Sequence, residues 1–164
     1  MESVSDDPHT TPMDDGVDPL LLDLHLCFDL QNTSRAFGDL YRKVLRDTGL
    51  TYPQYLVMIT LWEHQELPVK RIAQLLRLDS GTLSPLLKRM EAAGLVTRTR
   101  SATDERSVLV RPTPQGTELR EKAERVPAAI HAAANLTSRE GSALQHSLRQ
   151  LAASLDAFEF PPDH

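Results

Sequence analysis

The order of secondary structure in this chain is decided by residues 67–111, LPVKRIAQLLRLDSGTLSPLLKRMEAAGLVTRTRSATDERSVLVR. Apolar residues recur at helical spacing over about Lys70 to Leu76 and again in a second run. The second run consists of Leu83, Leu86, Leu87 and Met90. Two β-prone runs follow, Leu95–Arg100 and Ser107–Arg111, with a polar hairpin tip between them. Two helices joined by a turn and followed by a basic hairpin predict a winged helix-turn-helix.

The limits of the second helix in this motif follow from its glycines and its proline. The turn before it falls at Leu78–Gly81, and Gly94 marks its C-terminal end. Because Pro85 would break a helix interior, we expect this helix to begin between Ser80 and Thr82.

The segment before the motif predicts two further helices. Asp18-Pro19 is typical of a helix start with proline at the first helical position, and an apolar stripe continues to about residue 48. Thr51 and Gln54 match a capping box that opens a helix ending near His64. Its expected inward residues are Leu56, Ile59 and Trp62.

The segment after the motif is also expected to be helical. Thr113-Pro114 opens a helix that Pro127 is expected to kink. A second capping box, Thr137 to Glu140, opens a last helix whose apolar residues keep a heptad register. These residues are Leu144, Leu148, Leu151, Leu155 and Phe158.

The predicted fold class is therefore mainly α: a winged helix-turn-helix with a two-stranded β wing, and N- and C-terminal helices that form a dimerisation region. We expect a disordered acidic tail over residues 1–16 and a single domain over 17–160. Within the domain, the winged helix-turn-helix covers about 52–112, and the dimerisation helices cover about 18–48 and 114–159.

Charge and cysteine usage limit the function classes. Residues 1–25 hold seven acidic side chains and no Lys or Arg, which argues against a signal peptide. Residues 66–111 hold nine Lys or Arg against five Asp or Glu, which is compatible with a local basic face for nucleic acid despite the net charge of −5. The alternative is that these charges form an ordinary solvated helix face. One cysteine and no long apolar run indicate a cytoplasmic protein without a disulfide framework or membrane span.

The second helix of the motif and the hairpin carry the candidate DNA contacts. A major groove accepts one α-helix, and an arginine at a hairpin tip suits the narrow minor groove of A·T-rich DNA. Asp104 is placed to brace the guanidinium of Arg106. The predicted DNA-binding residues are Ser80, Thr82, Ser84, Lys88 and Arg89 on the helix, and Arg98, Arg100, Asp104 and Arg106 on the hairpin.

The only cysteine, Cys27, shares one helical stripe with Tyr41. An unbroken helix would separate the two by about 21 Å, so contact requires a second copy of the chain or a helix break near Gly38. Only a thiolate attacks peroxide quickly, and phenol donors such as Tyr41 and Tyr52 favour that charged form. The alternative from the residues alone is that all three belong to an interface core.

Leu26–Arg111 resembles the multiple antibiotic resistance regulator (MarR) family, and within it the organic hydroperoxide resistance regulator branch. The resemblance rests on six segments: Leu26-Cys27-Phe28, Thr51-Tyr52-Pro53-Gln54-Tyr55-Leu56, Leu61-Trp62-Glu63-His64, Leu78-Asp79-Ser80-Gly81-Thr82-Leu83, Leu87-Lys88-Arg89-Met90-Glu91 and Asp104-Glu105-Arg106-Ser107-Val108.

The resemblance implies a homodimer that represses peroxide-detoxification genes and leaves operator DNA when its N-terminal cysteine is oxidised by an organic hydroperoxide. The two tyrosines that hold this cysteine in the family correspond to Tyr41 and Tyr52. The chain resembles the one-cysteine type, in which a small cellular thiol is a possible mixed-disulfide partner. It departs from the pattern at Gln31, where some members have a tyrosine.

Two other functions stay open at this stage. A thiol peroxidase would use Cys27 for turnover but would leave the wing without a purpose. A repressor released by a reversibly bound phenolic or aromatic acid would need no cysteine. No metal site, cofactor or catalytic motif is expected, and the regulator reading implies that the chain is not an enzyme.

Overall fold

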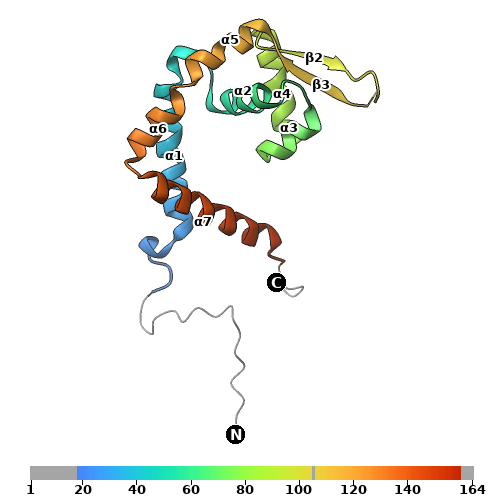
Figure 1. Cartoon of the computed structure of the whole chain (residues 1–164). Coiled ribbons are helices and arrows are strands. Elements are labelled where there is room, and N and C mark those ends of the chain that lie inside the picture. Colours follow the sequence, from blue (N-terminus) through green and yellow to red (C-terminus); the bar gives the residue numbers. More distant parts are fainter. Residues whose placement is uncertain (1–17, 105, 160–164) are drawn as a thin grey trace. The chain divides into compact units, whose positions relative to one another are not determined.

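The structure is a computed structural model that describes residues 18–104 and 106–159 (Figure 1). The expected acidic tail, 1–16, lies outside these residues. The chain divides into two compact units, Met1–Asp39 and Leu40–His164.

The first unit contains a short 3₁₀ helix, η1 (Leu22–Leu24), and most of α1 (Leu26–Val44). The predicted helix start at Asp18-Pro19 is wrong: His25, with φ −90° and ψ 95°, separates η1 from α1. The leucines before α1 are largely exposed, Leu20 by 81 %, so they lack the packing that stabilises a short helix. α1 continues through Gly38, so the helix break considered above does not occur.

The second unit opens with the last residues of α1, followed by η2 (Arg46–Thr48) and α2 (Tyr52–His64). The predicted start of α2 is confirmed, since the backbone N–H of Thr51 donates to Oε1 of Gln54 at 2.9 Å. The predicted inward face is wrong, because Ile59 is exposed while Leu56 and Trp62 are only partly buried. The buried residues of α2 are Tyr55, Val57, Met58, Thr60 and Leu61.

The helix-turn-helix consists of α3 (Val69–Leu76) and α4 (Ser80–Ala92). Arg77 ends α3 in the left-handed conformation, with φ 53°. Asp79 caps α4 by accepting the backbone N–H of Thr82 at 2.8 Å, which confirms the predicted start and leaves Pro85 in the second turn. The predicted inner face of α4, with Leu83, Leu86, Leu87 and Met90, is confirmed as buried.

The predicted two-stranded wing is confirmed, and a further strand extends it to a three-stranded antiparallel sheet. Strands β2 (Val96–Arg100) and β3 (Val108–Pro112) form the hairpin. The third strand, β1 (Leu67–Pro68), pairs with β3, which gives the order β1-β3-β2. β1 ties the start of α3 to the base of the wing, so the helix-turn-helix and the wing are held together.

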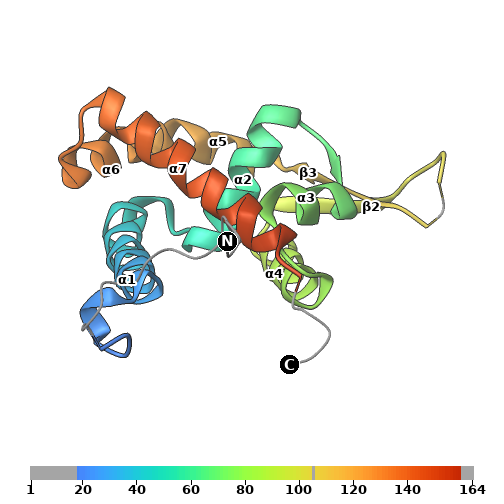
Figure 2. The same cartoon turned by 90° about the horizontal axis from the view of Figure 1, so that it is seen from below.

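Three helices follow the wing: α5 (Pro114–Ala123), α6 (Val126–Ala134) and α7 (Ser138–Ala157) (Figures 1 and 2). The kink expected at Pro127 is a full break, because Pro127 lies in the first turn of a separate helix. The capping box at Thr137 and Glu140 is confirmed. α7 leaves its predicted apolar stripe largely uncovered, with Leu155 exposed by 66 % and Phe158 by 63 %.

The core gathers buried side chains of α2, α3, α4, β2 and β3, together with Ala123 of α5 and Val126 of α6. Trp62 packs against this core, and its Nε1–H donates to the carbonyl of Gly116 at 3.0 Å, which anchors α2 to α5. In the part of the chain that the structure describes, no helix is both long and apolar enough to cross a membrane.

Candidate DNA-binding and thiol sites

The outer face of α4 carries the predicted helix contacts. Ser80, Thr82, Ser84, Lys88 and Arg89 are all exposed. Thr82 has a further role, since its hydroxyl donates to Asp79 at 2.8 Å and holds the pKa of that carboxyl below its usual range. The α4 surface therefore combines short hydroxyl side chains at its start with two cations further along, as expected for a helix that enters a groove.

The tip of the wing differs in detail from the prediction. Asp104 accepts the backbone N–H of Arg106 at 3.1 Å, so it shapes the turn and does not brace the Arg106 guanidinium as predicted. Arg100 and Arg106 are both exposed. The residue between Asp104 and Arg106 lies outside the described part of the chain.

Arg98 binds to Glu91 on α4. Its Nε and Nη2 donate to one carboxylate oxygen of Glu91 at 2.9 and 2.7 Å, and its backbone N–H donates to the other at 3.2 Å. These bonds hold the pKa of the Glu91 carboxyl below its usual range. The pair fixes the first strand of the wing to α4, and its charges offset one another.

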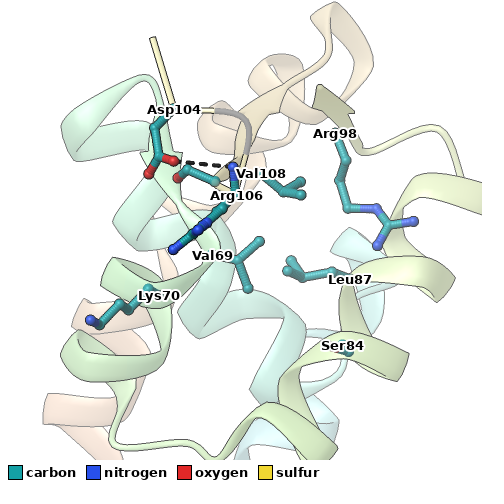
Figure 3. Close-up of a pocket in the computed structure, with 9 residues that line it drawn as sticks. Val69, Lys70, Ser84, Leu87, Arg98, Asp104, Arg106 and Val108 are labelled. Carbon is teal, nitrogen blue, oxygen red and sulfur yellow. Dashed lines mark hydrogen bonds between the residues drawn. The ribbon is translucent and has the colours of Figure 1, made fainter. Parts of the chain in front are cut away.

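A pocket of about 490 Å³ lies between the start of α3, α4 and the wing (Figure 3). Lys70 and Arg106 lie on one side of it in this view, Arg98 lies on the other, and Val69 and Leu87 lie between them. Ser84, Asp104, Ser107 and Val108 complete the lining. The pocket thus joins the two parts of the predicted DNA interface.

The two predicted thiolate-binding residues lie together. The ring centroids of Tyr41 and Tyr52 are 4.3 Å apart, and Tyr55 adds a third ring 6.1 Å from Tyr41. Partial burial, followed by the neighbouring Tyr52 and Tyr55, raises the pKa of Tyr41, so its phenol keeps its proton at neutral pH. A protonated phenol is a hydrogen-bond donor, as a thiolate partner must be.

Cys27 belongs to the first unit, where it is exposed and lines a hollow of about 350 Å³. The other lining residues are Leu20, Leu22, His25, Phe28, Gln31 and Arg35. Gln31 accepts a long hydrogen bond from Arg35 at 3.5 Å. The thiol therefore lies at a mainly apolar surface with one cation at its edge.

Sequence reasoning missed three side chains at these sites. Glu91 has no sequence signal as the partner of Arg98, because the pair joins two different elements. Lys70 lines the pocket from the start of α3, outside the helix predicted to contact the bases. Arg35 follows Cys27 and Gln31 at steps of four along α1, a spacing that does predict a shared face.

A helix-turn-helix, a wing pinned to it, and cations on both define a winged-helix DNA-binding protein. The transcriptional regulator SarA/Rot family matches residues 39–123. The organic hydroperoxide resistance transcriptional regulator of Bacillus subtilis (strain 168) is 43% identical over 143 residues, 87% of this chain and 97% of the relative. The regulator TtmR of Methylorubrum extorquens (strain PA1) is 44% identical over 140 residues, 85% of this chain and 72% of the relative.

Solved structures agree with this class. AbfR of Staphylococcus epidermidis is 36% identical, with a TM-score of 0.68 over 81% of this chain and 92% of that one. Reduced AbfR bound to DNA is 34% identical, with a TM-score of 0.64 over 81% and 93% of the two chains. The chain belongs to the SarA/Rot and MarR type of winged-helix transcriptional regulators, which are DNA-binding proteins and not enzymes.

Proposed function

We propose that this regulator is a homodimeric repressor that senses organic hydroperoxides by oxidation of Cys27 and then releases operator DNA. The observation that carries the proposal is the position of Cys27: its thiol is exposed in a hollow walled by Leu20, Leu22 and Phe28. An apolar wall beside a thiol suits a peroxide with an organic substituent better than hydrogen peroxide. The similarity to a hydroperoxide resistance regulator supports the same inducer.

The chemistry requires only the thiolate and the peroxide. The Cys27 sulfur attacks one peroxide oxygen, the S–O bond forms as the O–O bond breaks, and the alkoxide leaves and takes up a proton to become an alcohol. The product is a sulfenic acid. Since the sequence has no second cysteine, the next step is a mixed disulfide with a small cellular thiol, a sulfenamide, or over-oxidation by more peroxide.

The tyrosine pair supports a sensor shared by two copies of the chain. Because α1 is unbroken, Cys27 and Tyr41 are about 21 Å apart along one helix and cannot meet within it. In a two-fold dimer, Cys27 of one copy is free to meet the tyrosine pair of the other. Tyr41 and Tyr52 lie close enough together to donate to one sulfur, and the thiolate is then stabilised by both phenols.

The apolar stripe of α7 supports the dimer. Leu144, Leu148 and Leu155 are each at least 41 % exposed, and heptad spacing places them on one side of the helix. Phe158, exposed by 63 %, follows directly after the helix end. Such an apolar stripe is normally buried against another surface. The heptad pattern predicts that this surface is provided by the same helices of a second copy of the chain.

The DNA interface is proposed to consist of the outer face of α4 in the major groove and the wing in the adjacent minor groove. Ser80, Ser84, Lys88 and Arg89 are the helix contacts, and Arg100 and Arg106 are the wing contacts. Thr82 and Asp104 hold the backbone that presents them. The ion pair with Glu91 supports a positioning role for Arg98 instead of a direct DNA contact.

Cys27→Ser separates this proposal from its rivals. The variant should bind operator like the wild type and stay bound when an alkyl hydroperoxide is added, because it has no thiol to oxidise. A thiol peroxidase would lose turnover with the same substitution, and peroxide would have no effect on DNA binding. A repressor released by a reversibly bound ligand would keep its induction, and peroxide-driven release from the variant would overturn the proposal.

A further inference from the structure

The pocket between α3, α4 and the wing is lined by further residues beside the proposed DNA contacts Ser84 and Arg106. Its inner wall is apolar, with Val69, Leu87 and Val108, and its rim carries the cations Lys70 and Arg106. Arg98 is also on the rim, but Glu91 offsets its charge. Among the residues that the structure describes, Lys70 is exposed and makes no ion pair.

The position of the pocket matters because of how DNA grooves are arranged. One sugar–phosphate strand separates a major groove from the adjacent minor groove. A protein with α4 in the first and the wing in the second must therefore straddle that strand. The space between α4 and the wing is this pocket, as Figure 3 shows with Ser84 and Leu87 on the helix side and Arg106 and Val108 on the wing side.

We propose that this pocket seats one DNA backbone phosphodiester in each half-site, with Lys70 as its principal cation. The proposal rests on the DNA-binding function and adds α3 to the interface. The apolar wall faces the deoxyribose, while the ammonium of Lys70 and the guanidinium of Arg106 face the phosphate from one side. The hydroxyls of Ser84 and Ser107 are the neutral donors available to the same group.

A phosphate held here fixes the position of α4 and the wing relative to the duplex without reading sequence. β1 makes this effective, because it joins the start of α3 to β3 of the wing through the pairing of Leu67 with Val110. Lys70 is thus a positioning residue, whose loss weakens binding to all sequences alike.

The first test compares Lys70→Ala with Lys122→Ala, a charge-matched control on the exposed surface of α5. Binding to operator and to unrelated duplex is measured by fluorescence anisotropy at several salt concentrations. Lys70→Ala should weaken both by about fivefold and reduce the salt dependence by about one ion per half-site, whereas Lys122→Ala should bind like the wild type. Equal affinity and salt slope for Lys70→Ala and the wild type would overturn the proposal.

The second test identifies the phosphate itself. Single methylphosphonates, which are uncharged, replace the operator phosphates one at a time. The wild type should lose affinity at one position per half-site between the two grooves, and Lys70→Ala should have lost its sensitivity at that position only. Lys70→Gln, which removes the charge but keeps a polar side chain only one atom shorter than lysine, should give the same pattern if the alanine variant folds poorly.

If a Lys70 variant binds weakly but keeps the full wild-type methylphosphonate profile, the residue acts on folding and the proposal is wrong. Failure of the DNA-binding function itself is a separate result, because the wild type would then show no binding to operator in the same titration.

Discussion

Tyr41 and Tyr52 lie with their ring centroids 4.3 Å apart and their ring planes tilted by 35°. One comes from the last turns of α1 and the other is the first residue of α2. The contact makes the two phenols neighbours across the α1–α2 connection. Removing one hydroxyl therefore changes the environment of the other. For a thiol sensor, this means that the effects of removing the two hydroxyls should be coupled.

Tyr41→Phe and Tyr52→Phe should each slow the oxidation of Cys27 at neutral pH. Each variant removes a donor to the thiolate, and a hydrogen bond to a charged group contributes roughly 1.5–3 kcal/mol. The loss lowers the thiolate fraction, so we expect the rate of alkylation by iodoacetamide to fall by about tenfold or more. Affinity of reduced Tyr52→Phe for DNA should be unchanged. Wild-type alkylation rates in both variants would remove the tyrosines from the mechanism.

Gly116→Ala should destabilise the protein, because an added Cβ would overlap the backbone carbonyl oxygen of Leu95 and meet Cε of Met58 at 3.1 Å. The backbone contact has no flexible end that can yield, so we expect a loss of about 3 kcal/mol in the free energy of unfolding. Gly141→Ala on α7 is the control, since its Cβ would meet only His131 at 3.8 Å.

In Gly141→Ala the better helix propensity of alanine should raise stability by about 0.5–1 kcal/mol. Urea denaturation of both variants measures the difference. A Gly116→Ala variant as stable as the wild type would show that α5 does not approach the Leu95 carbonyl as closely as described.

Glu91→Gln should reduce the sensitivity of the protein to acid. Arg98 holds the pKa of the Glu91 carboxyl below its usual range, so the pair contributes its stabilisation above the ordinary glutamate pKa of about 4.3. That contribution is lost as the pH falls through the lowered pKa that Glu91 has in the folded protein. Between pH 6 and pH 3, the melting temperature of the wild type should therefore fall more than that of Glu91→Gln, by about two degrees.

Glu118→Gln is the matched control for this effect, since Glu118 is an exposed glutamate on α5. Its melting temperature should follow the wild type at every pH. Parallel curves for Glu91→Gln and the wild type would mean that the Arg98 pair does not hold the wing.

Leu148→Asp should dissociate the dimer. Leu148 lies in the heptad stripe of α7 and is 41 % exposed in the single chain, so a charge there would be desolvated in the interface. We expect the dimer dissociation constant to rise by at least tenfold, measured by analytical ultracentrifugation. Gln150→Asp, also exposed on α7 but outside the stripe, should remain dimeric. A wild type that is monomeric at micromolar concentration would contradict the dimer itself.

Strongly periodic elements were predictable from the sequence. The face of α4 and the starts of α2 and α7 follow from local spacing and capping, which are determined within one turn. The inward face of α2 was wrong because apolar residues surround that helix: Tyr55, Val57, Met58 and Leu61 are all buried. When a helix is apolar on every side, spacing cannot select the buried one.

Contacts between distant elements were not predictable. The two-residue strand β1 has too few residues for an alternation pattern, and it exists because Leu67 meets Val110. In the sequence, nothing distinguishes Arg98 from an ordinary basic surface residue, because its partner Glu91 lies on a different element, α4. The pairing of Tyr41 with Tyr52 was suggested by the family resemblance, and no spacing in the sequence predicts a ring contact between them.

The central claim is that oxidation of Cys27 releases DNA, and one measurement tests it most directly. Reduced protein is bound to labelled operator, an alkyl hydroperoxide is added, and anisotropy is followed while intact mass is recorded from the same sample. The account predicts that release keeps pace with modification of Cys27: one added oxygen atom, or the mass of a small thiol when one is supplied. Release from unmodified protein, or modified Cys27 in protein that stays bound to operator, would contradict it.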